Sequence, residues 1–112
     1  KGGIISPIIE KEFIKEIADV LDIEVIQKKV AGFHQVGAVM EANNLGGVIH
    51  PETDEEDIKN FSNVLGVNIE PATINGGIPF VSSGILANSN AVVVGNLTNG
   101  PEIMTLTRAF TN

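Results

Sequence analysis

The chain has 112 residues, enough for one small domain with a modest hydrophobic core. Hydrophobic residues make up 43% of the sequence, which excludes a disordered chain, and aromatic residues make up only 4%, so the core must be aliphatic. The net charge of −7 disfavours bare nucleic acid as the main partner and favours basic proteins. The absence of cysteine excludes disulfides and thiolate chemistry and suits a cytosolic protein, and no apolar run reaches the roughly 20 residues that span a bilayer.

The first part of the chain predicts a strand, a helix and a second strand. Residues 3–6 form a short apolar run, and apolar residues then recur at helical spacing up to residue 21. Ile23 and Val25 indicate the strand that follows this helix. The helix is expected to carry Ile17, Val20 and Leu21 into the core.

Residues 36–65 contain the clearest pattern in the sequence. Alternating apolar residues over 36–42 and a short strand at 48–49 flank a turn rich in asparagine and glycine, which predicts a β-hairpin. Thr53 and Glu56 have the spacing of a capping box, in which a hydroxyl and a carboxylate satisfy two backbone amides at the start of a helix. The predicted apolar face of that helix comprises Ile58, Phe61, Val64 and Leu65.

The remaining residues repeat this pattern. Residues 85–94 predict another hairpin, and a last helix follows with Pro101 in its first turn, where proline is favoured. The predicted apolar face of the last helix comprises Ile103, Leu106 and Phe110.

These segments are copies of one unit. Residues 2–7, GGIISP, match residues 46–51, GGVIHP, and the similarity continues at a spacing of 44 residues that becomes 45 after one inserted residue. We therefore predict a single domain with repeats over residues 1–45 and 46–89 and part of a third over 90–112. Because one such unit cannot bury its own apolar face, the repeats are expected to stack around a ring or along a line.

The two ends of the repeat pattern are incomplete. No strand precedes residues 3–6 to pair with them, and the last helix lacks the strand that follows it in the two earlier copies. We expect the chain to be part of a longer repeat protein. Because unpaired strand edges and apolar flanks invite association, we also expect self-association through the open repeat edges.

A family resemblance is carried mainly by turns and strand ends. The residues are Val36, Gly37, Asn43, Gly46, Gly47, His50, Pro51, Thr53, Thr73, Asn75, Gly77, Gly84, Asn88, Gly95, Thr98, Gly100, Pro101 and Glu102. This pattern covers nearly the whole chain and resembles the C-terminal half of the archaeal translation initiation factor 6 family, which has the pentein fold. The resemblance implies an α/β fold of pentein-like repeats of about 44 residues, each a strand-helix-strand-strand blade, and about two and a half blades of a five-blade propeller.

The resemblance also implies a function. Members of that family bind the large ribosomal subunit, prevent premature joining of the small subunit and take part in subunit maturation, without catalysis, cofactor or metal. The implied protein is a cytoplasmic ribosome anti-association factor that contacts basic ribosomal proteins, with a local rRNA contact at Lys28 and Lys29 as a further option and no membrane partner. The alternative is an isolated or engineered half-pentein fragment that self-assembles and does not bind ribosomes on its own.

The sequence lacks the residues that the enzymes of related families need for catalysis. Other pentein families act on guanidine groups and are similar to one another in needing a nucleophilic cysteine, which this chain lacks. Ser82 and Ser83 lie in no Gly-x-Ser-x-Gly motif, so a serine nucleophile is not indicated. The glycine pairs at residues 2–3, 46–47 and 76–77 lack the Lys-Ser or Lys-Thr of a phosphate loop and are predicted to be turn glycines.

Candidate partner-binding residues lie beside glycines at turns and strand ends, on what we expect to be one edge of successive repeats. They are Asn43, Asn44, Asn75, Asn88, Asn96 and His34. Asparagine also tolerates left-handed backbone geometry and bonds its own turn, so a structural role stays open. His50 is expected to hold its turn, and the acidic run over residues 52–57 is either a solvated helix start or a docking patch for a basic ribosomal protein.

Overall fold

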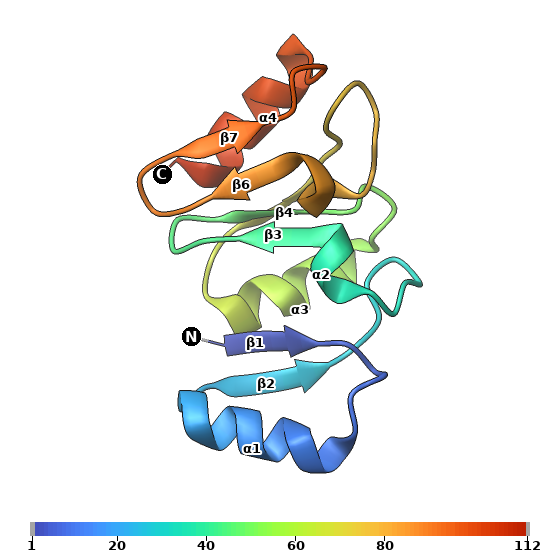
Figure 1. The fold of residues 1–112 in the computed structure, drawn as a ribbon, viewed down its shortest axis with the longest axis vertical. Coiled ribbons are helices and arrows are strands. Elements are labelled where there is room, and N and C mark those ends of the chain that lie inside the picture. Colours follow the sequence, from blue (N-terminus) through green and yellow to red (C-terminus); the bar gives the residue numbers. More distant parts are fainter. Residues whose placement is uncertain (1, 112) are drawn as a thin grey trace.

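The computed structural model describes residues 2–111, and its elements form an elongated row (Figure 1). In chain order the elements are β1 (Gly2–Ile5), α1 (Lys11–Leu21), β2 (Glu24–Gln27), α2 (Val36–Val39), β3 (Met40–Ala42), β4 (Gly47–Ile49), α3 (Glu55–Leu65), β5 (Ile69–Pro71), the 3₁₀ helix η1 (Val81–Gly84), β6 (Ile85–Ala87), β7 (Val92–Val94) and α4 (Gly100–Phe110). The three long helices begin 44 and 45 residues apart, the same spacings as those of the sequence pattern.

Three small sheets contain all of these strands. β1 pairs in parallel with β2, β4 pairs antiparallel with β3 and in parallel with β5, and β6 pairs antiparallel with β7. The three-stranded sheet is thus the complete form of the repeat. Among residues 2–111, β1 has no counterpart of β3 beside it and β7 has no counterpart of β5, as the incomplete repeats predicted.

The sheets do not close into a ring. They follow one another along the longest dimension of the chain, 43 Å against 28 and 23 Å, with α1 and β2 at the bottom of Figure 1 and β7 and α4 at the top. The prediction of about two and a half blades of a five-blade pentein-like propeller is therefore wrong for this chain, which forms an open row of small mixed sheets. A repeat length predicts that neighbouring units stack, but the rotation between units, which decides whether a ring closes, depends on packing that the pattern does not contain.

The core consists of two hydrophobic clusters on opposite faces of the three-stranded sheet. Phe61 of α3 and Ile49 of β4 belong to the first cluster, and Phe110 of α4 and Val48 of β4 belong to the second. Val48 and Ile49 are adjacent yet both fully buried, because successive residues of a strand face opposite sides. α3 contacts β1 and β5, while α4 contacts β4 and packs against side chains of β6 and β7. Each of these helices therefore lies between the sheets of two successive repeats.

The predicted apolar helix faces are only partly buried. The side chains confirmed as buried are Phe61, Val64, Leu106 and Phe110. Ile17, Ile58 and Leu65 are half-buried, and Ile103 is 47% exposed. The prediction is wrong for Val20 and Leu21, which are 76% and 60% exposed. The reason is that α1 packs against β2 of its own repeat, while its other face meets no neighbouring repeat among the described residues.

Two glycines allow helices to approach strands closely. A Cβ atom on Gly2 would lie 2.2 Å from the carbonyl oxygen of Val64 in α3, and one on Gly46 would lie 1.7 Å from the carbonyl oxygen of Ala109 in α4. Gly2 lies within β1, so the prediction of a turn glycine is wrong there, whereas Gly46 lies in the turn between β3 and β4. That prediction is confirmed over residues 76–77, where both φ angles are positive.

The segment before β3 also differs from the prediction. It forms the helical turn α2 rather than the start of a strand, because Val36 and Val39, three residues apart, are both buried on one side of the turn. The predicted capping box of α3 is absent. Asp54 is the N-cap residue and makes no side-chain cap bond, and the hydroxyl of Thr53 instead donates to the carbonyl oxygen of His50 at 2.8 Å.

Candidate functional site

Three of the predicted partner-binding residues lie at neighbouring hairpin tips. Asn43 follows β3, and its Nδ2 donates at 2.8 Å to the carbonyl oxygen of Asn88, at the tip of the β6–β7 hairpin. The side-chain oxygens of Asn43 and Asn88 each accept two backbone N–H groups of their own turns. Nδ2 of Asn44 donates to the hydroxyl of Ser89 over a longer 3.3 Å. These asparagines therefore close their turns and tie the β3–β4 hairpin to the β6–β7 hairpin.

The other three predicted residues lie at the opposite end of the hairpins (Figure 1). Asn75 precedes β6 and Asn96 follows β7. Asn75 has a φ of +50°, its side-chain oxygen accepts the N–H of Leu97 at 3.2 Å, and its side chain fills the space beside Gly95. Asn96 is exposed, as is His34 in the loop after β2. The six residues thus form two groups at opposite ends of the sheets, and the expectation of one continuous edge is wrong.

Among residues 2–111, the polar side chain with the most hydrogen bonds is that of Glu102, in the first turn of α4. Its side chain is buried, with 7% of the residue exposed. Oε2 accepts the hydroxyl of Thr73 at 2.6 Å and the N–H of Gly77 at 2.8 Å, and Oε1 accepts the N–H groups of Gly76 at 2.9 Å and Asn99 at 3.0 Å. One carboxylate therefore joins the loop after β5 to the start of α4.

These contacts keep Glu102 ionised. Burial by itself would raise the pKa of Glu102, but hydrogen bonds from Thr73 and from the amides of Asn99, Gly76 and Gly77 outweigh it and lower the pKa from 4.5 to about 2. The carboxylate also lies at a helix N-terminus, where negative charge is favoured.

Sequence reading missed the role of Glu102, although the signal was present. Asn99 is the N-cap residue of α4, and its side-chain oxygen accepts the N–H of Glu102 at 3.0 Å while Glu102 bonds the Asn99 amide in return. This is the capping box that the sequence analysis assigned to Thr53 and Glu56. The same three-residue spacing occurs at both helices, and only the structure shows which pair is bonded.

Three aromatic rings, which belong to residues before α2, after β4 and before η1, lie close together. The ring of His50 lies 5.2 Å from that of Phe33 and 6.0 Å from that of Phe80, and the two phenylalanine rings are 5.3 Å apart, edge to face. His50 is buried, and its Nδ1 accepts the N–H of Glu52 at 3.1 Å. The turn-holding role predicted for His50 is confirmed.

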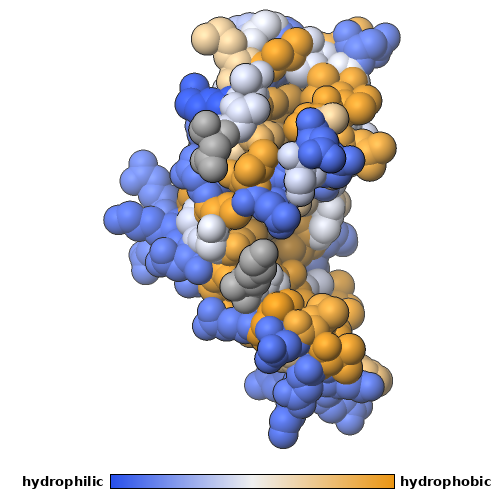
Figure 2. All heavy atoms as spheres, turned by 90° about the vertical axis from the view of Figure 1, so that its left-hand side faces the viewer, coloured by the Kyte–Doolittle hydropathy of each residue, from blue (hydrophilic) through white to orange (hydrophobic). Residues whose placement is uncertain are grey.

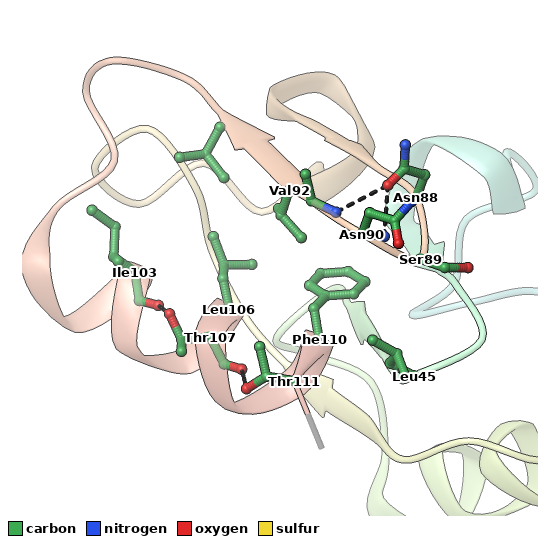
Figure 3. A pocket seen from close by; sticks show the side chains of 12 residues that line it. Leu45, Asn88, Ser89, Asn90, Val92, Ile103, Leu106, Thr107, Phe110 and Thr111 are labelled. Atoms are coloured by element: carbon green, nitrogen blue, oxygen red, sulfur yellow. Dashed lines mark hydrogen bonds between the residues drawn. The ribbon is translucent and has the colours of Figure 1, made fainter.

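A hollow of about 290 Å³ lies between the β6–β7 hairpin and α4 (Figure 3). Val92, Leu106 and Phe110 form its apolar wall, and Leu45 reaches its edge from the neighbouring hairpin. The remaining lining residues are both apolar and polar, namely Asn88, Ser89, Asn90, Ala91, Val94, Ile103, Thr107 and Thr111. In the preceding repeat β5 lies beside β4 and α3, whereas among residues 2–111 no strand lies in that place beside β7.

The two adjacent serines, Ser82 and Ser83, both donate hydrogen bonds to backbone carbonyl oxygens. The hydroxyl of Ser82 donates to the carbonyl oxygen of Met40 at 2.6 Å, and that of Ser83 donates to the carbonyl oxygen of Phe80 at 2.7 Å. Within residues 2–111, no three His, Asp or Glu side chains are grouped so as to hold a metal ion. The same part of the chain contains no helix with the length and apolar character needed to cross a membrane.

Comparison with known proteins places the chain in a family. The model of the eIF-6 family matches residues 1–109. The chain belongs to the eIF-6 family. It is 64% identical over 112 residues to translation initiation factor 6 of Nitrosopumilus maritimus and 63% identical over 110 residues to that of Cenarchaeum symbiosum, alignments that cover 100% and 98% of this chain. Identity to the factor of Pyrococcus abyssi is 40% over 110 residues, or 98% of this chain.

This eIF-6 family chain spans about half the length of these curated relatives, namely 51%, 50% and 48%. The structure also explains several residues of the resemblance pattern. Thr73 and Gly77 both donate hydrogen bonds to Glu102, and the hydroxyl of Thr98 accepts the N–H of Asn75 at 3.2 Å. In this family member, these pattern residues hold a loop against a helix start rather than forming a row of exposed contacts.

Proposed function

We propose that this eIF-6 family chain acts in translation initiation by binding the large ribosomal subunit and preventing premature joining of the small subunit. The observation that carries the proposal is the family match over residues 1–109, together with 63–64% identity to two proteins named translation initiation factor 6. A role in subunit maturation, in the cytoplasm and without catalysis, belongs to the same proposal. Because the chain spans half of those relatives, it supplies part of the contact surface.

The exposed ends of the hairpins are the proposed ribosome contacts. Asn44 keeps only one long hydrogen bond, and Asn96 and His34 are exposed, so these side chains can reach a partner. The net charge of −7 favours basic ribosomal proteins over rRNA. An rRNA contact at the lysine pair is weakened because Nζ of Lys28 lies 2.5 Å from Oδ1 of Asp57.

Co-sedimentation with purified archaeal large subunits tests this proposal. The chain should pellet with large subunits and not with small ones, and should lower the yield of joined ribosomes. A triple Ala variant of Asn44, Asn96 and His34 should bind about tenfold more weakly. Replacing Asn60 and Asn63 of α3, two exposed asparagines away from the hairpin ends, by Ala is the matched control. A folded chain that stays in the supernatant would contradict the proposal.

A second candidate property is self-association through the open edge of β1, with or without ribosome binding. It is favoured by one observation, that β1 pairs only with β2 among residues 2–111. Light scattering over a concentration series, combined with amide exchange, tests it. Association through this edge should slow exchange of the β1 amides as the concentration rises, and unchanged exchange in an associated sample would exclude the edge.

A further inference from the structure

Asparagine followed by glycine occurs twice in the sequence, and both pairs meet at the carboxylate of Glu102. The first pair, Asn75 and Gly76, lies in the loop after β5, and the second, Asn99 and Gly100, lies at the start of α4. Oε1 of Glu102 accepts the N–H of Gly76 at 2.9 Å and that of Asn99 at 3.0 Å. Asparagine is thermally labile, above all before glycine, which has no Cβ to keep its amide nitrogen away from the preceding side chain.

The asparagines at the hairpin tips differ in the residue that follows them. The tips of both hairpins lie on the left of Figure 1, the side that Figure 2 faces, where hydrophilic and hydrophobic side chains are mixed at the surface. Asn44 and Asn88 at these tips are exposed, but they precede Leu45 and Ser89, whose side chains hinder attack by the amide nitrogen. Contact with water by itself therefore does not select a reactive asparagine.

The reaction at an Asn-Gly pair is an intramolecular substitution that consumes only water. The amide nitrogen of the glycine gives its proton to water and forms a bond to Cγ of the asparagine, while the side-chain nitrogen takes up a proton and leaves as ammonia. The five-membered imide then adds one water molecule and opens to aspartate or to isoaspartate, whose backbone runs through Cγ. The nitrogen reaches Cγ only when it eclipses Cβ, which requires an asparagine ψ of about −120°.

Asn75 is held in a conformation that cannot form this ring. Its φ of +50° lies in the left-handed region, where ψ is also positive, so the nitrogen of Gly76 points away from the Asn75 side chain. That nitrogen also donates to Glu102. The Asn75 side chain fills the space beside Gly95, where an added Cβ would collide with its Oδ1. Backbone conformation, hydrogen bonding and packing therefore all protect Asn75.

Asn99 lies closer to the reactive geometry. Its ψ is 176°, so a rotation of about 60° brings the nitrogen of Gly100 over Cβ. Gly100 is the first residue of α4, where an amide has no acceptor within the helix. The rotation is opposed by the carbonyl oxygen of Asn99, which accepts the N–H of Ile103 at 2.9 Å, and by the two bonds that Asn99 exchanges with Glu102. All three bonds break when the first turn of α4 opens.

We propose that Asn99 is a site of spontaneous deamidation whose rate is controlled by Glu102, while Asn75 resists the reaction. The product weakens the contact that controls it. Aspartate at position 99 still caps α4 but places a second negative charge beside Glu102, and isoaspartate adds one atom to the backbone and so displaces the cap. Deamidation thus loosens α4 from the loop after β5 as the chain ages, a property separate from ribosome binding.

Peptide mapping by mass spectrometry after storage at neutral pH tests the proposal, together with a methyltransferase assay specific for isoaspartate. In the folded wild-type chain, Asn99 should be converted while Asn75 stays intact. In urea, both should be converted at similar rates, because both precede glycine and neither is held. Gly100→Ala should suppress conversion of Asn99 without changing the fold, since nothing lies within 4 Å of the added Cβ and the φ of Gly100 is not positive.

Glu102→Gln tests the role of the carboxylate. It should raise the rate at Asn99 about tenfold, because the first turn of α4 opens more often, and leave Asn75 intact, because the left-handed backbone of Asn75 remains. Thr73→Val, which removes one of the bonds to Glu102, should raise the rate at Asn99 by a smaller factor. Asp57→Asn, at the equivalent position of α3, is the matched control and should leave that rate unchanged.

Three results would overturn the proposal. The first is a folded wild-type chain that converts Asn75 as fast as Asn99, and the second is a folded chain that keeps Asn99 intact while the sample in urea reacts completely. The third is a folded Glu102→Gln chain that converts Asn99 at the wild-type rate. Faster conversion of Asn75 and Asn99 alike in Glu102→Gln would also contradict the proposal, because it would indicate unfolding of the whole chain rather than opening of one helical turn.

Discussion

The two junctions between successive repeats use the same backbone position in different ways. Asp57 and Glu102 are both the third residue of their helices, α3 and α4. Asp57 pairs with Lys28 at the surface, where the two side chains are 22% and 43% exposed. Glu102 is buried and bonds four groups. We call the contact made by α3, which includes Asp57, the first junction, and the contact made by α4, which includes Glu102, the second junction. A repeat can therefore preserve its helices while the polar contact between units changes in kind.

The difference originates in one inserted residue. In the first junction, Val30 and Phe33 exchange backbone hydrogen bonds across a short loop, and in the second Ile74 and Ile78 do so across a loop that is one residue longer. The insertion that changes the repeat spacing from 44 to 45 therefore lies in this loop. The longer loop directs the two consecutive amides of residues 76–77 at one carboxylate. Glutamate also has the length to reach back to its N-cap amide.

The apolar helix face is common to both junctions, so its loss should have the largest effect. Phe61 of α3 is fully buried in the first cluster. Phe61→Ala should lower the free energy of unfolding by about 3–5 kcal/mol, measured by denaturant titration. Val20→Ala, at a residue 76% exposed on α1, serves as the control and should change little. Equal midpoints for the two variants would show that the helix face was assigned to the wrong residues.

The close glycine contact is also common to both junctions. Gly46→Ala would place a methyl group 1.7 Å from the carbonyl oxygen of Ala109, so α4 must move away from β4. We expect a loss of about 1–3 kcal/mol or more in the free energy of unfolding. Gly37→Ala is the matched control because nothing lies within 4 Å of its added Cβ and its φ is not positive. A loss no larger than that of the control would mean that the helix shifts freely.

Breaking the second junction should cost about 1–3 kcal/mol. Glu102→Gln keeps the length of the side chain but replaces one accepting oxygen by an amide, so Oε2 can no longer accept from both Thr73 and Gly77. Denaturant titration measures the loss, and Asp57→Asn at the equivalent position is the comparison. Equal losses of unfolding free energy in the two variants would contradict the distinction between the buried Glu102 carboxylate and the Asp57–Lys28 ion pair at the surface.

The second junction should respond strongly to acid. The pKa of Glu102 is about 2 in the folded chain against an ordinary 4.5, so its stabilisation is fully present above about pH 4.5 and is lost as the pH falls toward 2. Melting temperatures measured between pH 5 and pH 2 should therefore fall more steeply for the wild type than for Glu102→Gln. Parallel curves would show that Glu102 titrates normally.

The contrast between the junctions shows how much the sequence predicts. Repeat spacing and apolar periodicity predict the three long helices and the two hairpins, because these depend on residues close together in the chain. The same pattern predicts Val20 as buried, and it is exposed because burial depends on whether another repeat lies beyond α1. The prediction of propeller blades was wrong for a similar reason, because the length of a repeat does not determine the rotation between neighbouring repeats.

The candidate site was predicted less well than the helices. The asparagines at hairpin tips were recognised as turn residues, yet their separation into two ends follows from strand direction, which a resemblance pattern does not carry. The sequence analysis named Glu102 only as one member of that pattern, although its spacing from Asn99 is that of a capping box. Its partners Thr73 and Gly76 lie more than twenty residues away in sequence, and such contacts leave no local signal.

The smallest effect is expected from the first junction. Lys28→Met removes the ion pair with Asp57, keeps the aliphatic part of the side chain and leaves a partly exposed carboxylate that water can reach. The melting temperature should change no more than it does for ordinary surface substitutions, and the small difference from the wild type should shrink as salt is raised, because exposed ion pairs are screened. The difference between Glu102→Gln and the wild type should persist in salt, since the bonded carboxylate is buried. A Lys28→Met variant that is as unstable as Glu102→Gln at high salt would mean that the two junctions hold their helices by the same kind of contact.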